Sequence, residues 1–308
     1  MFPDTYKGLS AESAQAMREL GPRWSEDIVA NRKLVLDIYT PVLSARSLRG
    51  IEVQRNVAYG PHERQVLDIY HASRGDPPKG VVLFVHGGAF VRGDKDANEH
   101  IYGNFLTYFV RHGYIGINLE YRQAPEAPYP DGSKDIELAL RWLQAHSQKL
   151  KTTAAPIFLV GHSAGGSHAA TYVLDPAVTP PQGHGVHALI LISARLRADV
   201  RADNPNAHGV KAYYGEDAQL YPRRSALTHA ERLDVPLFIA IAEFENPGLD
   251  VYAAELFHQV AHQHWLAPTF VQVPGHNHTS IVAHLDTGED SLGLMLRCFM
   301  QKCIHTHN

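Results

Sequence analysis

The feature that most constrains the fold is a succession of short apolar runs, each of strand length, that begins near residue 51. Eight runs follow one another, at 51–59, 66–70, 81–85, 114–119, 157–160, 188–192, 237–242 and 269–273. The first two read as a hairpin that turns at Gly60 and Pro61. Helix-length segments separate the later runs, for example 97–111, 132–149, 164–174, 249–264 and 289–301. Apolar strands alternating with helices predict one α/β domain over residues 1–308, with a mostly parallel sheet covered on both faces.

Two segments interrupt this alternation. Residues 1–48 carry apolar positions at helical spacing, and Pro41 is expected to end that run. Residues 195–227 are polar and leave the sixth strand at its carboxyl end, where ligands bind in open α/β sheets. We therefore expect an N-terminal helical cap and a second covering segment, with a long surface loop as the alternative for the second.

Composition excludes several classes of function. The chain has 308 residues, with 28 basic and 32 acidic side chains, so no charge excess favours nucleic acid. No segment reaches the roughly 18 apolar residues of a membrane helix, and the N-terminus has no apolar run of signal-peptide length. Cys298 and Cys303 lack the spacing of a zinc or redox motif. We expect a cytoplasmic protein with two reduced thiols.

The strand at 157–160 leads into Gly161-His162-Ser163-Ala164-Gly165, a GxSxG motif that opens a helix. A tight strand-to-helix turn strains the serine backbone and presents its hydroxyl at the top of the sheet. Strand and helix pass close together there, so both flanking glycines are needed. The Ala164 amide, at the start of the helix, can stabilise an oxyanion. We predict that Ser163 is a nucleophile; the alternative is a glycine-rich turn with a capping serine.

A second glycine-rich segment, His86-Gly87-Gly88-Ala89-Phe90, follows the third strand. Glycines just past a strand let the backbone approach a ligand and direct its N–H groups inward. The alternative is an ordinary Gly-Gly turn.

Three motifs together, HGGAF, YRQAPEAPYP and GHSAGG, resemble those of the hormone-sensitive-lipase-like branch of the α/β-hydrolases. The resemblance covers roughly residues 50–303. It implies an α/β-hydrolase fold with an eight-stranded, mostly parallel sheet and a helical cap. It also implies oxyanion donors at the amides of Gly88, Ala89 and Ala164, and a structural role for His86. Family members often carry a third glycine at position 89, but a backbone donor does not require one.

Two features favour a sub-branch of that family. His162 stands before the nucleophile, where many lipase-like members have Asp. Residues 58–70, AYGPHERQVLDIY, resemble the first strands of arylformamidases and related small-ester carboxylesterases.

An attacking serine needs a general base, and the base needs a group that orients it. In the resembled fold the chain order is serine, acid, histidine. Two histidines, His276 and His278, follow the last strand. The loop patterns of the family place the base at His278, and His276 is the rival.

The acid is expected after the seventh strand, where the chain reads Glu243-Phe-Glu-Asn-Pro-Gly-Leu-Asp250. The resemblance aligns the catalytic carboxylate with Glu245, although Asp is the usual residue. Glu is one methylene longer and can make the same hydrogen bond to the imidazole. Asp250, which opens the next helix, and Glu243 remain alternatives.

The 20 histidines raise the question of a metal site. His258, His262 and His264 form an HxxxHxH run, a spacing that can bind zinc. No HExxH motif, cysteine or open-site carboxylate accompanies them, so we expect no metal and no cofactor. Phe90 and Tyr214 are candidates for substrate contact, with packing as the alternative for each.

These expectations combine into a serine esterase that forms an acyl-enzyme on small to medium carboxylic esters with short acyl chains. The expected partner is a small-molecule ester, without nucleic acid or membrane, and a homodimer is possible. One rival is an arylformamidase or amidase with the same machinery. Another is a non-catalytic small-molecule receptor on the same fold, which predicts a broken nucleophile or base.

Overall fold

The computed structural model describes residues 5–306, so residues 1–4 of the N-terminal segment and the last two residues lie outside it. One sheet contains eight strands in the order β1-β2-β4-β3-β5-β6-β7-β8. Their bounds are Ile51–Ala58, Val66–Ala72, Val81–Val85, Ile115–Leu119, Ile157–His162, Ala188–Ile192, Leu237–Phe244 and Thr269–Asn277 for β1 to β8. The β1–β2 and β2–β4 pairs are antiparallel and the other pairs are parallel. The predicted mostly parallel sheet and its opening hairpin are confirmed.

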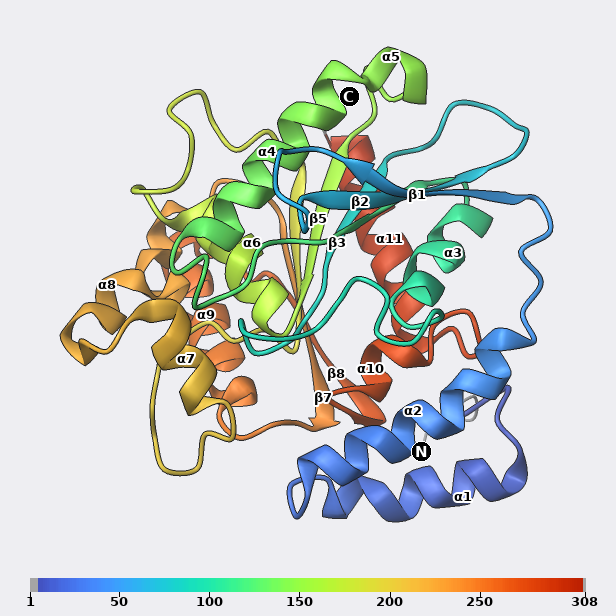
Figure 1. The fold of residues 1–308 in the computed structure, drawn as a ribbon, viewed down its shortest axis with the longest axis horizontal. Helices are drawn as coiled ribbons and strands as arrows, with labels where there is room; N and C mark the ends of the chain where they lie inside the picture. Colours follow the sequence, from blue (N-terminus) through green and yellow to red (C-terminus); the bar gives the residue numbers. More distant parts are fainter. Residues whose placement is uncertain (1–4, 307–308) are drawn as a thin grey trace.

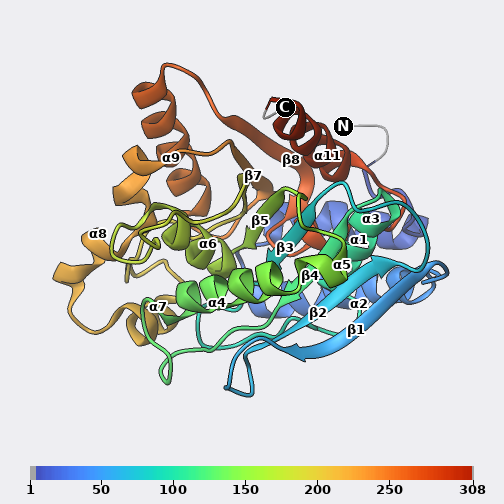
Figure 2. The ribbon, with the colours of Figure 1, turned by 90° about the horizontal axis from the view of Figure 1, so that it is seen from above.

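Helices cover both faces of the sheet (Figure 2). The helices on one face are α1 (Ala11–Leu20), α2 (Ile28–Ser44), α3 (Gly103–Arg111), α10 (Ser280–Ala283) and α11 (Ser291–Thr306). The other face holds α4 (Asp131–Ala145), α6 (Ala164–Leu174), α9 (Leu249–His264) and the 3₁₀ segment η3 (Ala226–Arg232). The remaining short elements are η1 (Gly21–Arg23), α5 (Ser147–Leu150), α7 (Ala207–Tyr214), η2 (Ala218–Leu220) and α8 (Tyr221–Arg224).

The central strand β3 shows how the apolar runs build two cores. All five of its residues are buried. Val82 and Phe84 belong to one core cluster, whereas Val81, Leu83 and Val85 belong to the other, as the period-2 alternation of a strand requires. Val85 pairs with Gly161 in the parallel β3–β5 register. The ends of these two strands therefore lie level, and the loops that follow them start side by side.

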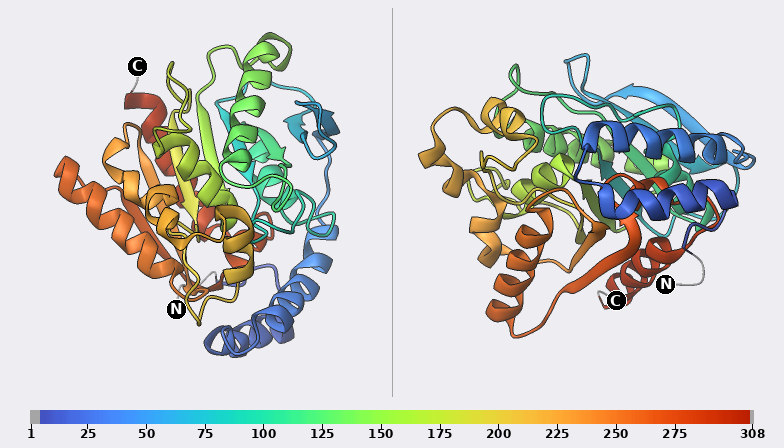
Figure 3. Two further views of the ribbon diagram at one scale, coloured as in Figure 1. Left: turned by 60° about the vertical axis from the view of Figure 1, so that its left-hand side comes forward. Right: turned by 90° about the horizontal axis from the view of Figure 1, so that it is seen from below.

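Helices α1 and α2 lie below the carboxyl ends of β7 and β8 (Figures 1 and 3). Helix α2 begins after Asp27, whose carboxylate accepts the Ala30 amide at 3.0 Å. It buries Val35 and Tyr39, one helical turn apart. The link from the helix pair to the sheet includes Trp24, whose Nε1–H donates to Asn246 Oδ1 at 2.9 Å.

The expected helix end at Pro41 is wrong, because α2 continues to Ser44 with Pro41 inside it. The missing proline N–H removes only the bond to the carbonyl of Asp37, four residues earlier. Asp37 is exposed, so water can satisfy that carbonyl, and only the last turn of the helix follows the proline.

The second interrupting segment, residues 195–227, contains α7, η2 and α8. These elements lie on the opposite side of the sheet from α1 and α2 (Figure 1). Within residues 5–306, none of the helices combines the length and hydropathy that crossing a bilayer requires.

Several histidines serve as core residues. Burial, and then the neighbouring His278, holds the pKa of His162 well below 6.5. Burial lowers the pKa of His168 to about 3 and that of His284 to about 4. The folded protein therefore keeps these three imidazoles neutral at pH values where the unfolded chain would protonate them.

We predict that the free energy of unfolding falls as pH decreases from 6.5 towards 4. The unfolded state binds more protons in this window, so each of the three histidines contributes a slope of about 1 kcal/mol per pH unit. Urea denaturation at pH 7.5, 6 and 5 measures the slope. The His168→Gln variant should show a shallower dependence, and an unchanged slope in that variant would contradict the assignment.

Candidate active site

Ser163 lies in the turn between β5 and α6 with φ 56° and ψ −121°, the strained conformation predicted for it. A Cβ on Gly161 would lie 2.5 Å from the Gly165 carbonyl oxygen. A Cβ on Gly165 would lie 2.1 Å from the carbonyl oxygen of Val85. Only glycine fits at either position, which confirms the close approach of strand and helix.

Backbone hydrogen bonds hold this turn in place. The Ser163 amide donates to the Ile192 carbonyl at 3.0 Å, and the Ser163 carbonyl accepts the amides of Gly166 at 3.0 Å and Arg195 at 3.1 Å. Hydrogen bonds to the neighbouring strand β6 and to the chain that follows it thus fix the backbone of Ser163. The hydroxyl is left on the surface of a cavity.

A chain of side-chain hydrogen bonds joins three of the residues predicted from the sequence. The Ser163 hydroxyl lies 3.0 Å from Nε2 of His278. Nδ1 of the same ring lies 2.5 Å from Oε1 of Glu245. His278 directly follows β8 and Glu245 directly follows β7, so two adjacent strands deliver base and acid to the serine turn.

The groups around Glu245 stabilise the ionised form of its carboxylate. Its Oε1 accepts the Asn246 amide at 2.8 Å. Burial alone would raise the pKa of Glu245, but the charge of His278 and hydrogen bonds from His278 and the Asn246 amide outweigh it and lower the pKa. A buried carboxylate beside Nδ1 fixes the tautomer that leaves Nε2 free to accept the serine proton.

The rival acids and the rival base lie elsewhere. Glu243 accepts the Gly275 amide at 2.6 Å, and Asp250 accepts the Val251 amide at 2.9 Å in the first turn of α9. His276 is fully buried, with Nε2 2.9 Å from Glu289 Oε1. Among the described contacts, the carboxylate that meets the His278 ring is that of Glu245, and neither Glu243 nor Asp250 does so.

The glycine loop lies against the serine. A Cβ on Gly87 would lie 2.9 Å from the Ser163 Cβ. Gly88 and Ala89 have φ of +153° and 51°, so the backbone doubles back beside the cavity. Ala164 is the first residue of α6, and its amide belongs to the N–H groups that lack a partner within the helix. The three predicted oxyanion donors therefore come from two backbone segments that meet at Ser163.

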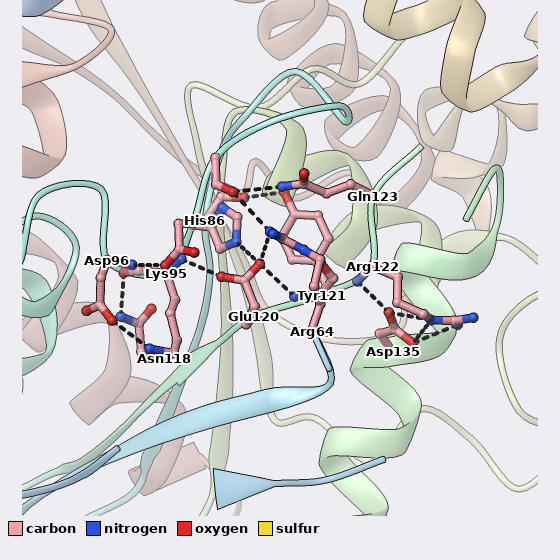
Figure 4. Close-up of polar contacts among 12 residues, drawn as sticks. Arg64, His86, Lys95, Asp96, Asn118, Glu120, Tyr121, Arg122, Gln123 and Asp135 are labelled. Carbon is pink, nitrogen blue, oxygen red and sulfur yellow. Dashed lines mark hydrogen bonds and ion pairs between the residues drawn. The ribbon is translucent and has the colours of Figure 1, made fainter. Parts of the chain in front are cut away.

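A buried network supports this loop from behind (Figure 4). The His86 ring stacks on Tyr121 with centroids 4.4 Å apart, and its Nε2 lies 3.2 Å from Glu120 Oε1. Arg64 pairs with the same carboxylate, and the Tyr121 hydroxyl donates to the His86 carbonyl at 2.9 Å. The backbone amide of Lys95 donates a hydrogen bond to Glu120 Oε2 at 2.7 Å. These contacts agree with the structural role expected for His86.

The cavity over Ser163 has a volume of about 300 Å³. Both interrupting segments reach it: α2 supplies one wall, and Pro205 and Asn206 line another part. The residues that line it are Trp24, Ile28, Val29, Arg32, Leu36, Gly87, Gly88, Ala89, Arg92, Gly93, Asp94, Ala97, Ile101, Tyr102, His162, Ser163, Pro205, Asn206, Asn246, His278, Thr279 and Val282.

Phe90 and Tyr214, expected to contact substrate, are not among the lining residues, and the structure corrects that expectation. Phe90 is 1% exposed and stacks on Tyr213 with centroids 4.8 Å apart. Tyr214 is 2% exposed and meets the edge of Phe90. Both rings fill the aromatic core beneath α7, because the buried covering segment needs apolar side chains of its own.

Among the described residues, one group has metal-ligand spacing, and it is not the HxxxHxH run. His276, His284 and Glu289 hold ligand atoms within 4.8 Å of one another. Their polar atoms are already engaged: the Ser280 hydroxyl lies 3.1 Å from Nδ1 of His276, and Nδ1 of His284 donates to the Ser280 carbonyl at 2.9 Å. This network holds the start of α10, next to the His278 loop.

Comparisons with known proteins identify relatives of this arrangement. A family model described as BD-FAE matches residues 67–177. The gibberellin receptor GID1 of Oryza sativa subsp. japonica is 31% identical over 239 residues, which cover 70% of this chain and 67% of the receptor. Esterase LipI of Mycobacterium tuberculosis is 39% identical over 90 residues, or 29% of this chain. The match spans 27% of the length of LipI.

The solved structure of a bacterial heroin esterase shares the whole fold. It superposes with a TM-score of 0.69 and covers 96% of this chain and 98% of that esterase, at 23% sequence identity. The predicted fold class is thereby confirmed over almost the whole chain.

We predict that Gly165→Ala lowers the free energy of unfolding by about 1–3 kcal/mol, because the added methyl group would overlap the Val85 carbonyl. Gly183→Ala is the control, since a Cβ there meets nothing within 4 Å and only its φ of +91° opposes the change. Urea denaturation compares the two variants. Equal stability would contradict the close approach.

Proposed function

Because this chain belongs to the α/β-hydrolase family, which includes esterases and the gibberellin receptor GID1, we propose that it is a serine carboxylesterase. The observation that carries the proposal is the unbroken chain from Glu245 through His278 to Ser163, which ends on the surface of a cavity. A buried serine, or a histidine without its acid, would not support it.

The reaction begins when an ester carbonyl enters the cavity beside Ser163. The hydroxyl oxygen attacks the carbonyl carbon as its proton passes to Nε2 of His278. The Nδ1–H stays hydrogen bonded to Glu245, whose negative charge stabilises the imidazolium. Nε2 then returns the proton to the leaving alcohol, and an acyl-enzyme remains. Water repeats the sequence on the acyl-enzyme and releases the acid.

The developing oxyanion needs donors that are already in place. Backbone amides of Gly88, Ala89 and Ala164 fill this role in the proposal. Their support is the contact between the glycine loop and Ser163 and the buried network around His86 and Glu120. Backbone donors held this way require little reorganisation during the reaction.

The cavity volume of about 300 Å³ favours small or medium esters with short acyl chains. It lies at the small end of the range for ligand sites. Ile28, Leu36 and Val282 give it apolar wall surface suited to an acyl or alcohol group.

A receptor without catalysis is the second candidate, because GID1 aligns with 70% of this chain. Binding alone places no requirement on the serine, base and acid. Their hydrogen-bonded arrangement here favours hydrolysis over binding.

We predict serine-dependent hydrolysis of p-nitrophenyl acetate and butyrate, with slower release from the octanoate. Ser163→Ala and His278→Ala should each lower kcat by at least about 10³-fold with the fold intact. His276→Asn is the matched control: it should reduce stability more than kcat, because His276 is buried outside the cavity. An N-formyl aromatic amine included as a substrate tests the formamidase rival. Folded wild-type protein that cleaves none of these compounds would favour the receptor.

We predict a graded loss among three acid variants. Glu245→Gln should lower kcat by about 10²–10⁴-fold, because it removes the charge that orients His278. Glu243→Gln and Asp250→Asn should stay within about threefold of wild type, since both side chains bond to backbone amides instead. A larger loss in Asp250→Asn than in Glu245→Gln would move the assignment.

A further inference from the structure

Two arginines from distant parts of the sequence line the same cavity as Ser163. Arg32 lies on α2, and Arg92 follows the glycine loop. Both side chains are exposed, so they stand where the cavity opens to solvent. Arg92 donates to the Asn206 side-chain oxygen at 3.1 Å, and thus connects the chain after the glycine loop to the second covering segment.

Within the described chain, neither guanidinium forms an ion pair, although many arginines of this protein do. Arg64, Arg122 and Arg195, for example, each pair with a buried or half-buried carboxylate. Asp94 is the one acid among the described residues that line the cavity, and its Oδ1 accepts the Asp96 amide at 2.9 Å. The opening therefore carries two positive charges against one negative charge.

The two arginines line one cavity of about 300 Å³, so their like charges oppose each other. Partial desolvation at the mouth of the cavity, and then the charge of Arg32, lowers the pKa of Arg92. Arg32 also contributes, after burial and His278, to the low pKa of His162. Its charge thus reaches the residue next to Ser163. An anion between the two arginines would relieve their repulsion and would accept hydrogen bonds from both.

We propose that the preferred substrates of this enzyme are esters that also carry a free carboxylate, held by Arg32 and Arg92 while the ester carbonyl meets Ser163. The proposal rests on the esterase function argued above and names its substrate class. A carboxylate matches the planar fork of a guanidinium, and a cavity of about 300 Å³ limits the anion to a few bonds from the scissile bond.

Two matched substrate pairs test the charge. One pair is 4-acetoxybenzoate and the neutral 4-acetoxybenzamide, which differ in charge on the alcohol side. The other is monomethyl glutarate and methyl 4-carbamoylbutanoate, which differ on the acyl side. At low ionic strength, kcat/KM for the anion of at least one pair should exceed that of its amide about tenfold, and the ratio should fall as salt is added.

The double variant Arg32→Gln/Arg92→Gln should bring that ratio towards one. Arg49→Gln is the matched control, because Arg49 is an exposed arginine that does not line the cavity, and it should keep the wild-type ratio. Equal rates for the two members of both pairs, or a ratio that survives in the double variant, would overturn the proposal.

Calorimetry on Ser163→Ala separates this inference from the esterase function. Tighter binding of 4-acetoxybenzoate than of 4-acetoxybenzamide, lost when both arginines are replaced, supports the anion site even if turnover is absent. Equal binding of the anion and the amide in this pair and in the glutarate pair refutes the site even if neutral esters are hydrolysed.

Discussion

The contact between the carboxyl end of β3 and the first turn of α6 sets the geometry of the whole site. Gly165 lies directly against the carbonyl oxygens of Val85 and His86, and Gly87 lies against the Ser163 side chain. The level β3–β5 register makes this contact possible. Once the two loops touch, the serine hydroxyl and the backbone amides of the glycine loop share one small space. In the proposed reaction, backbone amides fixed by this contact supply the electrostatic preorganisation that oxyanion stabilisation requires.

Much of the fold can be predicted from the sequence because parallel strands, buried on both faces, appear as continuous apolar runs. The run at 188–192 and the helix at 164–174 coincide with β6 and α6. The serine turn can also be predicted from local sequence, because its serine and both glycines lie within five consecutive residues. In contrast, the position of the N-terminal helices against the sheet depends on long-range contacts such as that between Trp24, just before α2, and Asn246, 222 residues apart. Helical periodicity therefore predicts an N-terminal helical cap, but it does not predict that Arg32 lines the cavity.

The buried set of Ser280, His276 and Glu289 contains the same residue types as the candidate triad and is linked in the same order. Ser280 is fully buried, so its hydroxyl cannot meet a substrate. The two sets differ in backbone strain and in access to a substrate. The GxSxG motif predicts the strain at Ser163, whereas the burial of Ser280 depends on the surrounding fold. Burial likewise separates His276, within β8, from His278, which directly follows it, and the local sequence does not show that difference.

The hydrogen bond between Trp24 and Asn246 joins a segment that is synthesised early to one that is synthesised late. Helix α2, which forms one wall of the cavity, is synthesised first. The segment that carries Trp24 and α2 can make its contact with Asn246 only after β7 and the residues that follow it have left the ribosome. The proposed acid and base, Glu245 and His278, emerge in the same final stretch. An incomplete chain therefore carries its serine turn without a closed pocket or a proton acceptor. Under the proposed mechanism, therefore, reactivity requires that the last strands have joined the sheet.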